Sequence, residues 1–231
     1  MSDTRRVLFV LTNHGELGDT GRDTGYYLPE AAHPWSVLRE AGWEIDLASP
    51  EGGPVPVDPE SRDLEDEANA RFLEAEEDAL ASTVAIEEVD PSDVAAIYFA
   101  GGHGTMWDFP GCEPLAALTA RIWEDGGVVG AVCHGPAGLV EVRLSDGTPL
   151  VEGREVSCFT DEEERAVECE DVVPFLLETR LRELGATIRK AEPWQEKVTV
   201  DGRLVTGQNP ASAEGVGRAM ARVLEPETAA V

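Results

Sequence analysis

The sequence predicts an α/β protein with a mostly parallel sheet that helices cover on both faces. Three continuous apolar runs, at residues 7–12, 94–100 and 128–132, lack the polar alternation of half-exposed strands. Such runs are typical of strands buried on both faces of a parallel sheet. Helix-like segments separate these strands along the chain, and this alternation of strand and helix is the pattern of α/β folds.

The first half of the chain justifies this class element by element. A polar, glycine-rich stretch at 13–25 follows the first strand. Residues 30–41 have apolar positions at helical spacing and stop before a glycine, which predicts a helix. Residues 43–49 alternate and predict a second strand. An apolar stripe over 63–82 predicts one long acidic helix.

The second half adds further elements of both kinds. Asp201 and Gly202, between two alternating runs, are a strong signal for a hairpin turn. No internal repeat or linker is visible, so we expect a single domain over 1–231, with an insertion around 58–89 and a hairpin at 197–207. The remaining expected elements are a helix at 113–125, a helix starting at 135–142, a strand at 155–159, an amphipathic helix at 172–184 and a closing helix at 213–224.

The charge of the chain restricts its partners. Forty-six acidic residues against 18 basic ones give a net charge of −28, while 42% of the residues are apolar. A surface this negative repels nucleic acid and anionic lipid, so we expect neither as a partner. The composition favours a folded protein adapted to strong salt, which screens the repulsion; an ordinary acidic protein is the alternative. No apolar run approaches the ~20 residues of a membrane span.

The cysteines favour a reducing compartment. They stand at positions 112, 133, 158 and 169, and no pair has the CxxC spacing. The apolar run at the N-terminus is too short for a secretory signal. We therefore expect a cytoplasmic protein without a disulfide framework.

The sharpest chemical signal follows the strand at 128–132, which runs directly into Cys133, His134, Gly135 and Pro136. A strand that turns through small residues into a helix forms a nucleophile elbow, which lifts one side chain out of the turn. Here that side chain is Cys133, and a helix N-terminus would favour its thiolate. The alternative is a cysteine that packs as a small buried hydrophobe.

Several longer motifs resemble a known family. They read AVCHGPAGL at the elbow, FAGGHGTMWDFP before it, and TGYYLPEAAHPW and DGRLVTGQNPAS toward the two ends. The chain resembles the PfpI superfamily of class I glutamine-amidotransferase-like proteins, and within it the heat-shock chaperone and glyoxalase III branch. The resemblance extends from Val7 to about Leu224. It implies a flavodoxin-like, doubly wound α/β sandwich and a homodimer.

The resemblance also implies a set of site residues. The nucleophile is Cys133, the catalytic histidine is His134, the acid that touches the sulfur is Glu30, and the acid that orients the histidine is Glu164. Backbone N–H groups of Gly102 and His134 would form the oxyanion site, with His103 lining the pocket beside them.

The two acids have plainer alternatives. Glu30 can be a helix N-terminal acid, favourable by ~0.3–1 kcal/mol without catalysis. Glu164 can belong to a solvated acidic face, and its neighbours Asp161, Glu162 and Glu163 compete for the same role. If Glu30 is enclosed under the sheet edge, its carboxyl would have a raised pKa and could share a proton with the Cys133 sulfur.

Other candidate residues fit packing better than chemistry. No local metal-ligand motif is present, and Gly101 to Gly104 lack the dinucleotide spacing, so we expect no metal and no cofactor. We expect His33 to make a structural hydrogen bond, while His14 has no assigned role. The remaining cysteines, Cys112, Cys158 and Cys169, are expected to pack, and Trp35, Trp107 and Trp194 are expected to wall the pocket or fill the core.

The resemblance implies a glutathione-independent glyoxalase, a lyase that converts a small α-oxoaldehyde, methylglyoxal, to lactate, or a related deglycase. Two alternatives remain: a holdase-type stress chaperone with an exposed apolar patch, and a cysteine peptidase or amidohydrolase with the same nucleophile. The loop at 13–25 and the insertion at 58–89 would roof the pocket and restrict it to small substrates.

Overall fold

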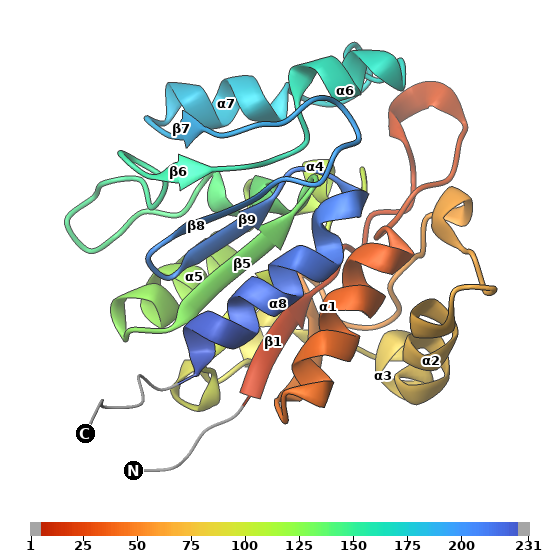
Figure 1. Cartoon of the computed structure of the whole chain (residues 1–231), viewed down its shortest axis with the longest axis horizontal. Helices are drawn as coiled ribbons and strands as arrows, with labels where there is room; N and C mark the ends of the chain where they lie inside the picture. The colour runs from red at the N-terminus through yellow and green to blue at the C-terminus, as the bar shows by residue number, and fades with distance from the viewer. Residues whose placement is uncertain (1–5, 226–231) are drawn as a thin grey trace.

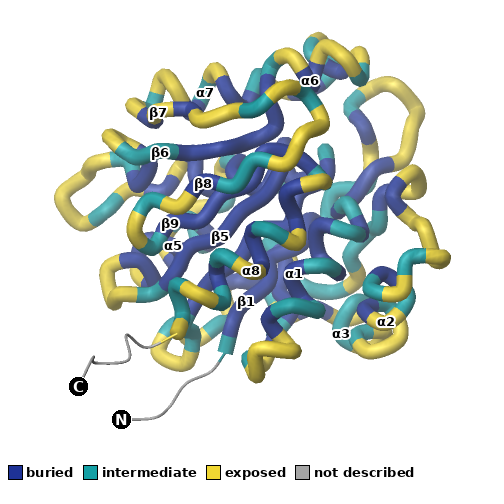
Figure 2. The backbone as a smooth tube through the Cα atoms, viewed as in Figure 1, coloured by how far each residue is buried: buried dark blue, intermediate teal, exposed yellow. Residues whose placement is uncertain are grey.

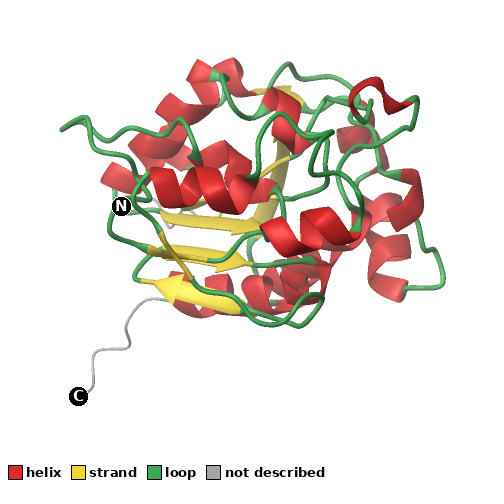
Figure 3. Ribbon diagram, turned by 90° about the horizontal axis from the view of Figure 1, so that it is seen from above, coloured by secondary structure: helices red, strands yellow, loops and turns green. Residues whose placement is uncertain are grey.

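Seven strands form one sheet at the centre of the computed structural model, which describes residues 6–225. Every neighbouring pair in the sheet is parallel except the β8–β9 pair, which is an antiparallel hairpin. The predicted α/β class is confirmed, and helices flank the sheet above and below in Figure 3. In spatial order the strands are β3 (Val84–Ala85), β2 (Glu44–Ser49), β1 (Arg6–Val10), β4 (Ala96–Phe99), β5 (Val128–Val132), β9 (Leu204–Gly207) and β8 (Val198–Asp201).

Helices cover the sheet on both faces because successive strand residues point to opposite sides. Val7 and Phe9 belong to one hydrophobic cluster, and Leu8 and Val10 belong to the other. The first cluster includes residues of α1 (Leu28–Glu40) and α8 (Ala213–Leu224), which pack side by side in Figure 1. The second includes residues of α5 (Glu113–Glu124). Burial on both faces, visible as the dark centre of Figure 2, explains the continuous apolar runs.

A small second layer lies beyond the C-terminal edge strand in Figure 1. Its two short strands, β6 (Glu155–Val156) and β7 (Thr187–Ile188), pair in parallel. The chain between them forms α6 (Asp161–Ala166) and α7 (Leu177–Glu183). This layer brings the acidic segment that begins at Asp161 over the end of the main sheet.

The prediction of one continuous helix over 63–82 is wrong. The segment forms two helices, α2 (Glu67–Ala75) and α3 (Glu77–Ala81). The break is at Glu76, whose backbone leaves the helical region at φ −111° and ψ 17°. The Glu76 carboxylate accepts a 2.8 Å hydrogen bond from the indole N–H of Trp35. The break therefore coincides with a tertiary contact that the apolar stripe did not reveal.

Two further helices differ from expectation. The helix expected over 172–184 begins only at Leu177, because Pro174 disfavours a helical conformation just before it and Leu176 is an extended N-cap. The helix expected at 135–142 is instead a 3₁₀ helix. Sequence patterning also missed β3, α4 (Thr105–Asp108) and α6, all of which are short. The 3₁₀ segments are η1 (Gly18–Thr20), η2 (Pro59–Ser61), η3 (Ile86–Glu88), η4 (Pro91–Asp93), η5 (Gly135–Leu139) and η6 (Pro210–Ser212). None of the described helices is long and apolar enough to cross a membrane.

Candidate active site

Cys133 lies directly after β5 in a strained turn. Its φ of 59° is in the left-handed region, which non-glycine residues rarely adopt. Two main-chain hydrogen bonds hold it there: Cys133 N–H donates to Gly207 (3.0 Å) and Phe159 N–H donates to the Cys133 carbonyl (2.8 Å). Gly135 allows the turn because a Cβ there would come within 2.3 Å of the Phe99 carbonyl oxygen. The turn has the strained geometry expected of a nucleophile elbow.

The surroundings of Cys133 oppose the resting thiolate that the sequence predicts. The segment that follows is a 3₁₀ helix of five residues and not the α-helix expected there. Burial raises the pKa of the Cys133 thiol well above its usual value, and the nearby Glu30 carboxylate raises it further. The His134 N–H beside the sulfur lowers this pKa without outweighing burial. Cys133 is therefore a thiol that needs a proton acceptor.

Glu30 is held beneath Cys133 by the first turn of α1. The Tyr27 N–H donates to the Gly101 carbonyl (2.9 Å), and the Tyr98 hydroxyl donates to the Glu30 carbonyl (2.6 Å). These bonds fix the helix start to the end of β4. A Cβ at Gly101 would lie 2.3 Å from Glu30 Oε2, so only glycine leaves room for the carboxyl.

The Glu30 carboxyl is enclosed, as expected, and has an altered proton affinity. The side chain is fully buried, and neither carboxyl oxygen has a hydrogen bond of normal geometry. Burial raises the Glu30 pKa to about 8, although the neighbouring Cys133 thiol and the Gly101 N–H partly lower it. A buried acid that shares its surroundings with a thiol is suited to proton transfer near neutral pH.

Glu164 joins two histidines on the opposite side of Cys133. Its Oε2 lies 2.8 Å from His134 Nε2, and its Oε1 lies 2.8 Å from His103 Nε2. The two imidazole rings are 4.2 Å apart between centroids. Of the acids at positions 161 to 164, Glu164 is the one that contacts His134.

The charges of this cluster follow from burial and from these contacts. Burial would raise the Glu164 pKa, but His134 and His103 lower it to about 2. Burial would lower the His103 pKa, but hydrogen bonds with Cys169 and Glu164 raise it to about 9. Burial and the charge of His103 lower the pKa of His134. At neutral pH the cluster is thus an ionised glutamate, a protonated His103 and a neutral His134.

The contacts determine which nitrogen of His134 carries its proton. An ionised carboxylate only accepts hydrogen bonds, so His134 Nε2 must donate to Glu164. The other nitrogen, Nδ1, is then an acceptor, and it lies 3.4 Å from Cys133 Sγ. His134 is therefore placed to take a proton from the thiol, while Glu164 fixes its tautomer.

His103, His134 and Glu164 form the one group of possible metal ligands found among the described residues. Their ligand atoms lie within 4.8 Å of one another. Both histidines already bond to the Glu164 carboxylate through their Nε2 atoms. A metal would therefore have to replace both hydrogen bonds, and the geometry fits a proton-transfer cluster better.

A cavity of about 250 Å³ opens over Cys133, His103 and His134. Gly102 also lines it, and its N–H donates to no main-chain carbonyl in the described part of the chain. The loop at 13–25 and the start of the insertion contribute to the walls, as expected, and an ion pair of 3.0 Å between Arg22 and Glu60 joins them. Further lining residues are Leu17, Asp23, Tyr27, Asp58, Phe159, Val167, Cys169, Trp194 and Pro210.

Several sequence candidates lie elsewhere. His33 makes the expected structural contact, 3.0 Å from Asp66 Oδ2. His14 stacks on Trp107 at 5.1 Å between ring centroids, and neither residue lines the cavity.

The remaining candidates divide between core and cavity. Trp35 is buried in the hydrophobic core between α1 and α2, and Trp194 alone of the three tryptophans lines the cavity. All four cysteines are free. Cys158 is buried and Cys112 is partly buried, but Cys169 also reaches the cavity.

Sequence reasoning missed two features of the site. Phe159 packs against His134, with ring centroids 4.4 Å apart, and no local pattern announced this role. The helix that carries Glu164 also went unnoticed, although Thr160 and Glu163 have the spacing of a capping box. The structure contains that capping box, with both reciprocal bonds present.

Comparisons with known proteins agree with this geometry. The DJ-1/PfpI family model matches residues 24–222. The chain belongs to the DJ-1/PfpI family. The resemblance to the PfpI superfamily is thereby confirmed.

Individual relatives point to the glyoxalase branch of the family. Glyoxalase 3 of Candida albicans is 34% identical over an alignment of 226 residues, which covers 90% of this chain and 93% of that protein. The glutathione-independent glyoxalase HSP31 of Saccharomyces cerevisiae is also 34% identical, over 224 residues and the same shares of the two chains.

Solved structures are similarly close. The crystal structure of glyoxalase III from Candida albicans matches with a TM-score of 0.89 at 31% identity, covering 96% of this chain and 98% of that one. The Rapid Encystment Protein 24 KDa of Francisella tularensis matches with a TM-score of 0.93 at 37% identity, covering 96% and 100%.

Proposed function

We propose that this protein is a glutathione-independent glyoxalase that converts methylglyoxal to lactate. The observation that carries the proposal is one thiol with two proton-transfer groups beside it. Cys133 Sγ lies 3.4 Å from His134 Nδ1, and the buried Glu30 carboxyl is close enough to the sulfur to raise its pKa. The relatives named as glyoxalases, at 34% identity over 90% of the chain, support the same reaction.

The first step forms a covalent bond between enzyme and substrate. Cys133 Sγ attacks the aldehyde carbon while its proton passes to His134 Nδ1. The aldehyde oxygen becomes the hydroxyl of a hemithioacetal when it receives that proton. Backbone N–H groups of Gly102 and His134 would stabilise the negative charge that develops on this oxygen.

The next steps move hydrogen between the two substrate carbons. A base removes the proton from the former aldehyde carbon while the ketone oxygen takes up a proton, which gives an enediol. A proton then adds to the former ketone carbon and the hydroxyl on the sulfur-bearing carbon loses its proton, which gives a thioester of lactate with Cys133. Glu30 and His134 are the groups assigned to this exchange. The oxidation of one carbon and the reduction of the other balance within the substrate, so no external electron carrier is required. Water then hydrolyses the thioester to lactate and frees Cys133.

The test is the formation of lactate from methylglyoxal by the purified protein in molar KCl, with and without glutathione. Lactate formation independent of glutathione is expected. Cys133→Ala should abolish it, whereas Cys158→Ala is the matched control because Cys158 is a buried free cysteine outside the cavity. Glutathione-dependent turnover, or an active Cys133→Ala variant, would contradict the proposal.

We infer a homodimer from the resemblance to the PfpI superfamily, whose members are commonly dimeric. We infer a cytoplasmic location and a salt-adapted surface from the composition of the sequence. The holdase alternative needs an exposed apolar patch, and the peptidase alternative needs an open cleft. The cavity walls contributed by the loop at 13–25 and by the insertion favour a small substrate over a peptide. The large apolar side chains exposed among the described residues, Leu64, Val84, Trp194 and Val200, come from four separate segments.

A further inference from the structure

Trp194 is an unusual residue at the cavity wall. Its side chain lines the cavity, yet the residue is 46% exposed, which leaves a large apolar surface in contact with water. Its ring is 5.7 Å from that of Phe159, which in turn packs against His134. The three rings therefore form a continuous row that leads from the exposed wall to the catalytic histidine.

The backbone of Trp194 is strained. Its φ of 66° lies in the left-handed region, where a bulky non-glycine residue is an outlier. Such a conformation persists only when surrounding contacts determine it, and these outliers gather at ligand-binding sites. The contacts that hold the Trp194 backbone in this conformation therefore bear on the function of the residue.

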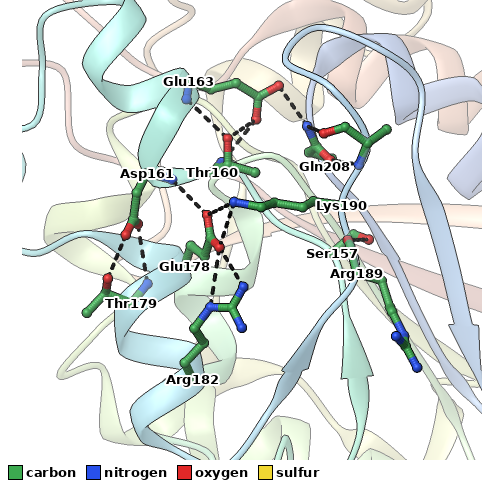
Figure 4. Close-up of polar contacts among 11 residues, drawn as sticks. Ser157, Thr160, Asp161, Glu163, Glu178, Thr179, Arg182, Arg189, Lys190 and Gln208 are labelled. Atoms are coloured by element: carbon green, nitrogen blue, oxygen red, sulfur yellow. Dashed lines mark hydrogen bonds and ion pairs between the residues drawn. The ribbon is translucent and has the colours of Figure 1, made fainter.

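Glu163 supplies the contact that fixes Trp194. The backbone N–H of Trp194 donates a hydrogen bond to Glu163 Oε1 at 2.9 Å. The same oxygen accepts from Gln208 Nε2 (3.0 Å) and from Asn209 Nδ2 (2.8 Å). The other oxygen, Oε2, accepts from the backbone N–H (3.0 Å) and hydroxyl (2.9 Å) of Thr160. Figure 4 shows Glu163 between Thr160 and Gln208.

The loop around Trp194 is tied to the end of β9 as well. The Ala191 N–H donates to Gln208 Oε1 (2.9 Å), and Asn209 Nδ2 donates to the Gln195 carbonyl (2.9 Å). Upstream, Lys190 pairs with the buried Glu178 at 3.1 Å, as Figure 4 also shows. The indole is thus presented on a loop held by several hydrogen bonds, although the residue is 46% exposed.

Glu163 is adjacent to Glu164, and the first turn of α6 carries both. One glutamate of this turn holds His134, and the other holds the loop that carries Trp194. The position of the aromatic wall is therefore coupled to the position of the catalytic cluster by a single helical turn.

We propose that Trp194 forms a subsite for an apolar substituent on the α-oxoaldehyde, and that Glu163 is the positioning residue that holds this subsite open toward Cys133. The inference rests on the proposed glyoxalase reaction. Once the aldehyde carbon is bonded to Cys133 Sγ, the group on the ketone carbon extends toward the cavity walls. Methylglyoxal places only a methyl group there, which cannot cover an indole. A planar aromatic substituent can stack on it and bury it.

The kinetic test compares methylglyoxal with phenylglyoxal. Stacked aromatic pairs contribute up to about a factor of ten beyond burial. Trp194→Ala should therefore raise KM for phenylglyoxal about tenfold, with kcat for both substrates and KM for methylglyoxal within about twofold. Trp194→Phe should restore most of the phenylglyoxal affinity. Trp107→Phe is the matched control, because Trp107 stacks on His14 away from the cavity.

Glu163→Gln tests the positioning role. Glutamine has the same size but only one acceptor oxygen. It therefore cannot accept both the bonds from Trp194, Gln208 and Asn209 and the two bonds from Thr160. We expect KM for phenylglyoxal to rise as in Trp194→Ala, and to rise by a larger factor than KM for methylglyoxal. Trp194→Ala variants that gain phenylglyoxal activity would overturn the proposal, because Trp194 would then limit substituent size. An equal loss on both substrates would also overturn it.

A second measurement does not depend on glyoxalase activity. Cys133 is alkylated with iodoacetamide or with its N-phenyl analogue, and the modified peptide is quantified by mass. Trp194→Ala should lower the N-phenyl rate about tenfold relative to the iodoacetamide rate. If methylglyoxal yields no lactate but this ratio falls, the proposed function fails and the subsite stands. If lactate forms and the ratio is unchanged, the subsite fails alone.

Discussion

The first turns of α1 and α6 each bring a buried glutamate to the same cysteine–histidine pair, but in opposite electrostatic states. Glu30 on α1 has no hydrogen bond of normal geometry, and burial raises its pKa to about 8. Glu164 on α6 is only 2% exposed, yet the two histidines lower its pKa to about 2. Burial therefore does not determine the state of a carboxyl by itself. The partners that replace water decide whether it exchanges protons or stays ionised.

This contrast indicates different chemical roles for Glu30 on α1 and Glu164 on α6. A carboxyl with a pKa near the working pH can accept and return a proton during turnover. A carboxyl that is always ionised can instead hold a histidine in one tautomer and stabilise its charged form, as orienting acids do in catalytic triads. Glu30 fits the first description and Glu164 fits the second. Substitutions that remove one function at a time test the comparison.

The largest effect is expected from Glu30→Gln. Glutamine keeps the size of the side chain but cannot exchange a proton, so turnover of methylglyoxal should fall by about 10²–10⁴-fold. Lactate formation under substrate-saturating conditions is the measurement. Glu40→Gln, at the exposed opposite end of α1, is the control. An unimpaired Glu30→Gln variant would remove the proton-transfer role of Glu30 and leave Cys133 as a nucleophile of another kind.

A smaller loss is expected from Glu164→Gln. The neutral amide no longer stabilises a positive charge on His134 when the thiol proton arrives, so kcat should fall by ~10²-fold. Glu162→Gln is the neighbouring control, because Glu162 is exposed on the same helix. If both variants are equally active, the Glu164 contact with His134 is structural only.

The pH dependence of turnover separates the two regions directly. With pKa values of about 2 and about 9, Glu164 and His103 keep their charges between pH 4 and 8, whereas Glu30 titrates at about 8. We expect kcat/KM for methylglyoxal to rise as the pH approaches 8, since only the ionised Glu30 can accept a proton. A rise with an apparent pKa below 6 would contradict this assignment.

The reactivity of Cys133 above pH 8, where most of Glu30 is ionised because its pKa is about 8, gives the same test without substrate. Because the Glu30 carboxylate raises the Cys133 pKa, Glu30→Gln should lower that pKa and accelerate alkylation by iodoacetamide. The same substitution would thus increase thiol reactivity while it decreases turnover. In the wild type, Cys133 is expected to react before Cys112, Cys158 and Cys169, because its proton acceptors are already in place; equal rates at all four would argue against an activated nucleophile.

The surface provides a further contrast with these enclosed charges. Salt screens the repulsion among the charges that make up the net charge of −28, because the Debye length falls to ~3 Å at 1 M ionic strength. For a chain of this size each kcal/mol of relieved repulsion raises the melting temperature by about 2–4 °C, so we expect the melting temperature to rise steeply between low and molar KCl. Circular dichroism during heating measures it. A flat curve would show that the acidic composition has another cause.

The smallest effect concerns stability. Glu30 ionises near pH 4.3 in the unfolded chain, but at about 8 in the folded protein. The folded state therefore loses stability as the pH rises from 4.3 to 8, and Glu30→Gln abolishes this loss. The variant should melt a few degrees above wild type at pH 8 and at about the same temperature at pH 4. A variant that melts lower at pH 8 would show that the Glu30 carboxyl is stabilised by partners, as Glu164 is.

The sequence by itself determined the central strands of the sheet and the elbow, and its motifs pointed to the candidate site residues. The runs at 7–12, 94–100 and 128–132 became β1, β4 and β5 because strands buried on both faces leave a local signal. The motif around Cys133 carried the family resemblance. Only the tertiary structure decided that Glu164, and not Glu163, contacts His134, because one residue of difference on α6 turns the side chain toward another partner. It also decided that Cys133 is a thiol and that Trp194 lines the cavity. Those properties depend on desolvation and on contacts between segments distant in the chain, which no local pattern contains.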